Sequence, residues 1–102
     1  MITKRRDAHK ILESMVGPLN FGRLINSLRL CEEMSLAQFS KKLGITVSHL
    51  CDIEKRRKFV SPERAAKFAK ILGYSQEQFV CLALQDIIDQ AGIKMKVQLV
   101  AA

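Results

Sequence analysis

Hydrophobic residues recur at intervals of three and four along five stretches of the chain between residues 21 and 91. In the first stretch, Phe21, Leu24 and Leu28 fall on one side of a helix. The last stretch is the richest in such positions, namely Phe79, Val80, Ala83, Leu84, Ile87, Ile88 and Ala91. Because stripes of this period bury one face of each helix, the pattern predicts an all-α bundle. The five predicted helices cover residues 21–32, 35–43, 46–55, 61–72 and 75–91.

Serines and glycines mark the predicted helix ends. Serines stand where a hydroxyl can accept a free backbone N–H of the first turn: Ser35 with Gln38 and Ser75 with Gln78, spaced as capping boxes, and Ser61 before Pro62. Glycines follow the apolar runs, where a left-handed residue can close a helix: Gly44, Gly73 and Gly92. The helices are therefore joined by short turns.

Two segments flank this bundle, which we place at residues 21–92. Residues 1–20 form an N-terminal arm, in which residues 7–16 have the apolar spacing of an amphipathic helix. That helix either folds back onto the bundle or docks a partner protein. Residues 93–102 form a C-terminal tail.

Apolar and polar residues alternate along this tail, a period of two that predicts a β-strand. A single strand in an all-helical chain has no partner of its own, so we expect it to pair with a second copy across a two-fold axis. The expected dimer residues are Met95, Val97 and Leu99. The alternatives are a frayed tail and a dimer formed by the last helix.

Charge and composition indicate which classes of protein this chain can belong to. The chain has 102 residues and a net charge of +7, which suits a single domain with a polyanionic partner. Residues 21–60 contain eight Lys and Arg against four acids, whereas residues 61–92 contain three against four. The three cysteines form no CxxC pair, and no apolar run has the length of a membrane span or a secretory signal. We expect a cytoplasmic protein with no membrane partner.

The segment from residue 35 to residue 58 carries the most informative pattern. Two short helices with inward-facing apolar residues meet at a tight turn around Gly44. The opposite face of residues 46–52 is left free and polar, and a basic run follows at Lys55–Lys58. A helix of this kind can lie in the major groove of DNA, with cations placed beside it for phosphates.

At these residues the sequence resembles the phage-repressor-like (Xre-type) helix-turn-helix family. The residues that carry the resemblance lie within about residues 21–72: Arg29, Ser35, Phe39, Leu43-Gly44-Ile45, Leu50, Ile53-Glu54-Lys55 and Ser61-Pro62. The resemblance implies a five-helix, lambda-repressor-like DNA-binding bundle whose recognition helix spans residues 46–55. The continuation through residue 80 is also similar to bacterial members that include HigA-style antitoxins.

The resemblance also implies roles for individual residues. Base edges would be contacted by Thr46, Val47, Ser48, Cys51 and Asp52. The phosphate backbone would be contacted by Ser35, Leu36, Lys55, Arg56, Arg57 and Lys58. For Asp52, an ion pair with Lys55 or Arg56 on the same helix is an equal alternative.

The sequence departs from the family pattern at several places, one of them Ser40, where alanine is usual between the two helices. Leu36 stands where many members have a glutamine that braces a phosphate, and Arg56 stands where a glycine commonly ends the recognition helix. Arg56 requires either a different helix end or a left-handed backbone at a cost of roughly 1 kcal/mol. Residues 46–52 contain no Arg, Lys, Gln or Asn, the side chains that make the strong bidentate base contacts. Such a face predicts modest direct readout and greater reliance on DNA shape.

These features predict a sequence-specific transcriptional repressor that binds a palindromic operator in double-stranded DNA as a homodimer. The alternative is an antitoxin that neutralises a small ribonuclease toxin through residues 7–16 and autoregulates its operon. An enzyme is not expected, because the chain has no Ser/His/acid set and no phosphate-cradling glycine loop. We expect neither a metal nor another cofactor, because His9 and His49 lie forty residues apart with no ligand at suitable spacing.

Overall fold

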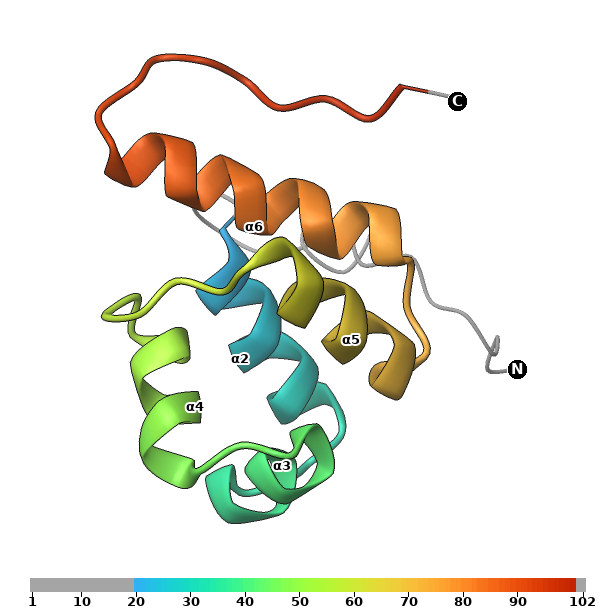
Figure 1. Ribbon diagram of the computed structural model, residues 1–102. Coiled ribbons are helices and arrows are strands. Elements are labelled where there is room, and N and C mark those ends of the chain that lie inside the picture. The colour runs from blue at the N-terminus through green and yellow to red at the C-terminus, as the bar shows by residue number, and fades with distance from the viewer. Residues whose placement is uncertain (1–19, 101–102) are drawn as a thin grey trace.

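The computed structural model describes residues 20–100, and within them the chain forms five helices (Figure 1). These are α2 (Phe21–Cys31), α3 (Leu36–Leu43), α4 (Val47–Glu54), α5 (Pro62–Leu72) and α6 (Gln76–Gln90). The predicted all-α bundle is confirmed. Every helix end lies within one residue of its predicted position, because the predicted ranges included capping residues. Residues 1–19 lie outside the described part of the chain, and with them the predicted helix over 7–16.

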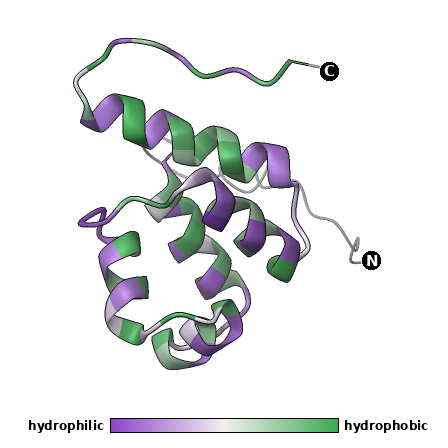
Figure 2. Cartoon of the chain, viewed as in Figure 1, coloured by the Kyte–Doolittle hydropathy of each residue, from purple (hydrophilic) through white to green (hydrophobic). Residues whose placement is uncertain are grey.

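The core is built from buried hydrophobic residues of all five helices, and hydrophobic stretches alternate with polar ones along each helix (Figure 2). Four phenylalanines from four different helices are almost completely buried: Phe21, Phe39, Phe68 and Phe79. The rings of Phe21 and Phe79 meet edge to face with centroids 5.7 Å apart, which joins α2 to α6. Truncating any one of these side chains to alanine costs about 3–5 kcal/mol.

Of the two predicted capping boxes, the one at Ser35 is complete, whereas at Ser75 only the bond to the serine hydroxyl is present. At Ser35 both halves of the capping box are present: its hydroxyl accepts the Gln38 N–H at 3.1 Å, and the Gln38 amide oxygen accepts the Ser35 N–H at 2.9 Å. At Ser75 the hydroxyl accepts the Gln78 N–H at 3.3 Å. Gly44 and Gly73 close α3 and α5 with φ values of 76° and 80°.

The predicted C-terminal strand is wrong, because residues 93–100 contain no strand and instead run back along α6 (Figure 1). The Gln85 side chain in α6 forms hydrogen bonds with two backbone groups that a strand would use for pairing. Its amide nitrogen donates to the Met95 carbonyl at 2.9 Å, and its amide oxygen accepts the Val97 N–H at 2.7 Å. The Cys81 thiol also donates to the Val97 carbonyl at 3.4 Å. The alternating pattern therefore reflects an extended segment docked on a helix.

None of the helices within residues 20–100 combines the length and the apolar character needed to cross a membrane. In the same range, no three His, Cys, Asp or Glu side chains gather where they could hold a metal ion.

Candidate nucleic-acid interface

Two short helices and a tight turn form the predicted motif. Gly44 adopts the left-handed conformation, its N–H donates to the Lys41 carbonyl at 3.2 Å, and the Ile45 N–H donates to the Ser40 carbonyl at 3.0 Å. A Cβ at Gly44 would have no heavy atom within 4 Å, so the backbone angle, and not crowding, favours glycine there. Thr46 then caps α4, because its hydroxyl oxygen accepts the His49 N–H at 3.0 Å.

The helix α4 presents one face to the core and one to the surface. Leu50 and Ile53 are buried, whereas Thr46, Val47 and Ser48 are exposed. The remaining two predicted base-contacting residues, Cys51 and Asp52, are half-buried. We call the outward side formed by Val47, Ser48, Cys51 and Asp52 the reading face.

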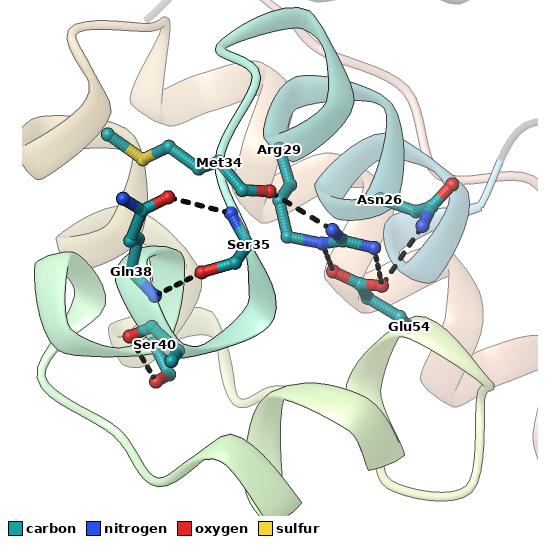
Figure 3. A network of polar contacts seen from close by, with 8 residues as sticks. Asn26, Arg29, Met34, Ser35, Gln38, Ser40 and Glu54 are labelled. Atoms are coloured by element: carbon teal, nitrogen blue, oxygen red, sulfur yellow. Dashed lines mark hydrogen bonds and ion pairs between the residues drawn. The ribbon is translucent and has the colours of Figure 1, made fainter.

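A largely buried ion pair fixes the C-terminal end of α4 against α2 (Figure 3). Arg29 donates to Glu54 through Nε at 2.8 Å and through Nη2 at 3.1 Å, and its Nη1 donates to the Met34 carbonyl at 3.1 Å. The Asn26 amide adds a bond to Glu54 Oε1 at 3.0 Å. The hydrogen bond to Glu54 is the main reason that the pKa of Arg29 is raised.

Arg29 and Glu54 belong to the residues that carry the family resemblance, but the sequence alone predicts no role for either. One signal was present: an acidic residue in the last turn of a helix opposes the helix dipole, so a cation is expected nearby. The contribution of Asn26 could not be inferred, because no local pattern connects it to α4.

A close approach of backbones supports the same junction. A Cβ added to Gly22 in α2 would lie 2.6 Å from the Ile53 carbonyl oxygen and 3.1 Å from that of Glu54. The first distance is too short for a side-chain carbon, and the second is tight. Gly22 therefore lets α2 cross the end of α4 at a separation that no other residue permits.

The chain reverses direction directly after α4. Arg56 stands where glycine is common, and the sequence left open a different helix end or a left-handed backbone. Its φ of 60° shows that the backbone is left-handed. Its guanidinium extends to α6, where Nη2 lies 3.9 Å from Asp86 Oδ1. The reversal brings the Arg57 N–H to the Asp52 carbonyl at 2.7 Å.

Asp52 forms an ion pair, but with different residues from those predicted. Its carboxylate accepts from Arg57 Nε at 2.9 Å and lies 3.9 Å from Lys58 Nζ. The predicted partners Lys55 and Arg56 assumed a continuing helix, whereas the turn at Arg56 carries the next two cations back over α4. The hydrogen bond between Arg57 and Asp52 is the main reason that the pKa of Arg57 is raised.

This arrangement of two capped helices around a left-handed turn agrees with a comparison by sequence. A model of helix-turn-helix domains matches residues 26–79, which span most of α2 and all of α3 to α5. The chain belongs to the helix-turn-helix family. Comparison with curated proteins and with solved structures gave no match. The resemblance to the Xre-type family is confirmed, and with it the class of DNA-binding transcriptional regulators.

Within this helix-turn-helix domain, His49 connects α4 to α5. Its Nδ1 lies 3.2 Å from Arg64 Nη1, so the neutral ring accepts this bond. Partial burial is the largest cause that lowers the pKa of His49, followed by the charges of Arg64 and Lys58. The lowered pKa favours the neutral imidazole, which adds no charge beside the reading face.

The first turn of α3 holds the other two predicted phosphate contacts of the helix-turn-helix domain. Ser35 is exposed and its hydroxyl oxygen caps the helix. Leu36 is half-buried and packs against the core, and it lines an open cleft of about 560 Å³ between α2 and α4. An apolar side chain cannot bond a phosphate, so any contact at Leu36 is limited to its backbone N–H at the helix N-terminus.

Proposed function

We propose that the chain is a transcriptional repressor that binds a palindromic DNA operator as a homodimer, with α4 in the major groove. The observation that carries this proposal is the outward side of α4, where Val47 is 44% exposed beside the exposed Ser48. Basic residues follow at the end of the same helix. Binding would prevent transcription by occupying the promoter.

Base contacts are assigned to Thr46, Val47, Ser48, Cys51 and Asp52. The Val47 side chain suits a thymine methyl group, and the hydroxyls of Thr46 and Ser48 can donate or accept. The Asp52 carboxylate can accept from a cytosine amino group. Because none of these side chains forms a bidentate pair with a purine, sequence-dependent DNA shape supplies part of the specificity.

Phosphate contacts are assigned to the N-terminus of α3, at Ser35 and Leu36, and to Lys55, Arg56 and Lys58. Backbone N–H groups at a helix N-terminus favour an anion, and the three cations are exposed. Each such contact adds to the salt dependence of binding.

A second copy is the proposed occupant of the apolar surface on α6 and the tail. Ile87, Ile93, Met95 and Leu99 are between 38% and 64% exposed, while Val97 turns partly toward α6. Contact through this surface leaves α3 and α4 uncovered for DNA (Figure 1). In such a dimer the two half-sites lie about 34 Å apart, one turn of the duplex.

Fluorescence anisotropy tests the proposal with the duplex upstream of the gene and a scrambled duplex, each at two salt concentrations. We expect tight binding to the first duplex, which weakens steeply with salt. Lys58→Ala should reduce the slope of log K against log salt by about one, whereas the matched change Lys70→Ala in α5 should not. Equal and weak binding to both duplexes would reject the repressor.

Sedimentation velocity tests the homodimer. Met95→Glu combined with Leu99→Glu should yield monomers, because each places a charge in the proposed contact. The control Leu30→Glu alters an equally exposed leucine on α2 and should leave the dimer intact. A monomeric wild-type chain at micromolar concentration would exclude the dimer.

The antitoxin alternative depends on residues 7–16, which lie outside the described residues, and it stays a prediction.

A further inference from the structure

The Arg57 guanidinium is held over the outward side of α4. Its Nε donates to Asp52 Oδ1 at 2.9 Å, and its Nη2 lies 3.7 Å from the Cys51 sulfur. Both contacts are with residues of the reading face, although Arg57 itself follows the helix. The side chain remains 57% exposed, so it is both restrained and accessible.

The backbone explains why Arg57 points back along the helix. Arg56 is in the left-handed conformation, and the next two N–H groups, of Arg57 and Lys58, both donate to the Asp52 carbonyl, at 2.7 and 3.2 Å. The start of the loop is thereby tied to the last turn of α4. From this position the Arg57 side chain reaches back to the last turns of α4, where its partners Asp52 and Cys51 lie.

The guanidinium also lies near the centre of the reading face. Leu50 and Ile53 define the inward direction of α4, and at 100° per residue the opposite direction passes through Ser48. One turn further along, Cys51 and Asp52 lie on either side of this line. A group that contacts both of them therefore lies between them, in line with Ser48.

This position leaves a donor edge available. A guanidinium has five N–H donors, and the two contacts engage Nε and one hydrogen of Nη2. Within residues 20–100, Nη1 has no hydrogen-bond partner. The edge formed by Nη1 and Nη2 matches the paired acceptors that guanine presents in the major groove, N7 and O6.

We propose that Arg57, oriented by Asp52, reads a guanine through N7 and O6 in the major groove at the C-terminal end of α4. This inference rests on the proposed function and supplies the bidentate contact that residues 46–52 lack. It replaces the phosphate role that the sequence predicts for Arg57. A phosphate at this edge would lie close to the Asp52 carboxylate and be repelled by it, whereas the guanine edge carries no net charge.

The role of Asp52 in this proposal is to position Arg57. A free arginine must lose rotamer freedom when it binds a base, and the bond from Nε to Asp52 restricts that freedom before binding. The cation Lys58 lies 3.9 Å from the other carboxylate oxygen and partly offsets its charge. Asp52 can accept from a neighbouring cytosine at the same time, because a carboxylate has several acceptor sites.

Selection from a pool of randomised duplexes, followed by anisotropy on the enriched duplex, tests the proposal. Each selected guanine is then replaced by 7-deazaguanine, which lacks the N7 acceptor. At one position per half-site, we expect this change to weaken wild-type binding by about tenfold. Arg57→Ala should weaken binding to the unmodified duplex by a similar factor and should show no further loss with 7-deazaguanine.

Two variants provide controls. Lys58→Ala changes the adjacent cation and should keep the response to 7-deazaguanine while lowering the salt slope by about one. Asp52→Asn retains an acceptor oxygen for Arg57 without the charge, and it should reduce the guanine preference only in part, whereas Asp52→Ala should reduce it further. Circular dichroism of each variant establishes that the bundle remains folded.

The outcomes separate this inference from the proposed function. If Arg57→Ala weakens all duplexes alike and lowers the salt slope, Arg57 contacts phosphate and the inference fails, while the repressor stands. If the wild-type chain enriches no sequence from the pool, the proposed function fails and the inference with it.

Discussion

The Arg29 guanidinium holds the Glu54 carboxylate with two hydrogen bonds, 2.8 and 3.1 Å long, across the junction of α2 and α4. Only 15% and 8% of the two side chains remain exposed. This pair sets the orientation of α4 against the rest of the bundle, and so it determines where the reading face points.

Replacement of Arg29 by methionine should destabilise the domain by about 3 kcal/mol, because the largely buried Glu54 carboxylate is left without its cation. Urea unfolding measures this loss. The control is Lys42→Met, which removes the cation of the more exposed pair with Glu32, 3.0 Å apart, and should cost less than about 1 kcal/mol. Equal losses in the two variants would contradict the structural role given to Arg29.

Gly22→Ala should lower stability by about 1–3 kcal/mol, although alanine is the better helix former. The new methyl group would collide with the Ile53 carbonyl oxygen and force α2 away from α4. DNA binding by Gly22→Ala should also weaken, because the end of α4 must shift.

Gly44 provides a matched contrast, because alanine there meets no atom and is disfavoured only by φ. Asparagine tolerates the left-handed region, so Gly44→Asn should recover most of the stability that Gly44→Ala loses. Gly22→Asn should recover none of the stability that Gly22→Ala loses, because the collision there involves any Cβ. Both series can be followed by thermal unfolding, and recovery in Gly22→Asn would argue against the collision.

Asp86 makes the stability of the domain depend on pH. Burial is the largest cause that raises its pKa, opposed by the hydrogen bond from the Phe21 N–H at 3.1 Å and by the charge of Arg56. Because the folded chain holds this proton more tightly than the unfolded chain, the contribution of Asp86 to stability is largest at low pH. It falls as the pH rises from the unfolded pKa to the raised folded pKa, and is constant above.

Asp86→Asn should remove this contribution while its amide oxygen still accepts the Phe21 N–H. We expect the variant to be at least as stable as the wild type at pH 7 and to lose its advantage as the pH falls. Urea unfolding between pH 3 and pH 7 measures the difference, with Glu77→Gln, an exposed carboxylate of the same helix, as the control. A pH-independent difference between Asp86→Asn and the wild type would show that the carboxyl does not titrate in this range.

Gln85→Ala should release the tail from α6 without unfolding the bundle, because it removes the bonds to both Met95 and Val97. The lysines at positions 94 and 96 make trypsin a suitable probe, and cleavage there should become several times faster. Val97→Pro should act in the same direction, because proline has no N–H to donate. Gln90→Ala is the control at an exposed position of α6. Unchanged cleavage in Gln85→Ala would mean that these bonds do not hold the tail.

The features that were predicted correctly depend on residues close together in sequence. The capping box joins Ser35 to Gln38 across three residues, and the left-handed turn needs little beyond Gly44 itself. The apolar spacing of each helix likewise repeats within a few turns. Such local preferences act in the same way in any fold, so the sequence alone identified the five helices, the motif and its family.

The tertiary structure decided the contacts between residues that are distant along the chain or that follow a reversal of it. The alternating pattern of the tail predicts a strand, but the tail lies along α6 instead. The Gln85 side chain of that helix bonds the backbone groups that a strand would pair. Asp86 bonds Phe21 across 65 residues. The turn at Arg56 gave Asp52 its partner Arg57, which a continuous helix would have placed elsewhere. Periodicity records which face of an element is buried, but the partner of each polar group depends on how the elements pack, and packing is a property of the whole chain.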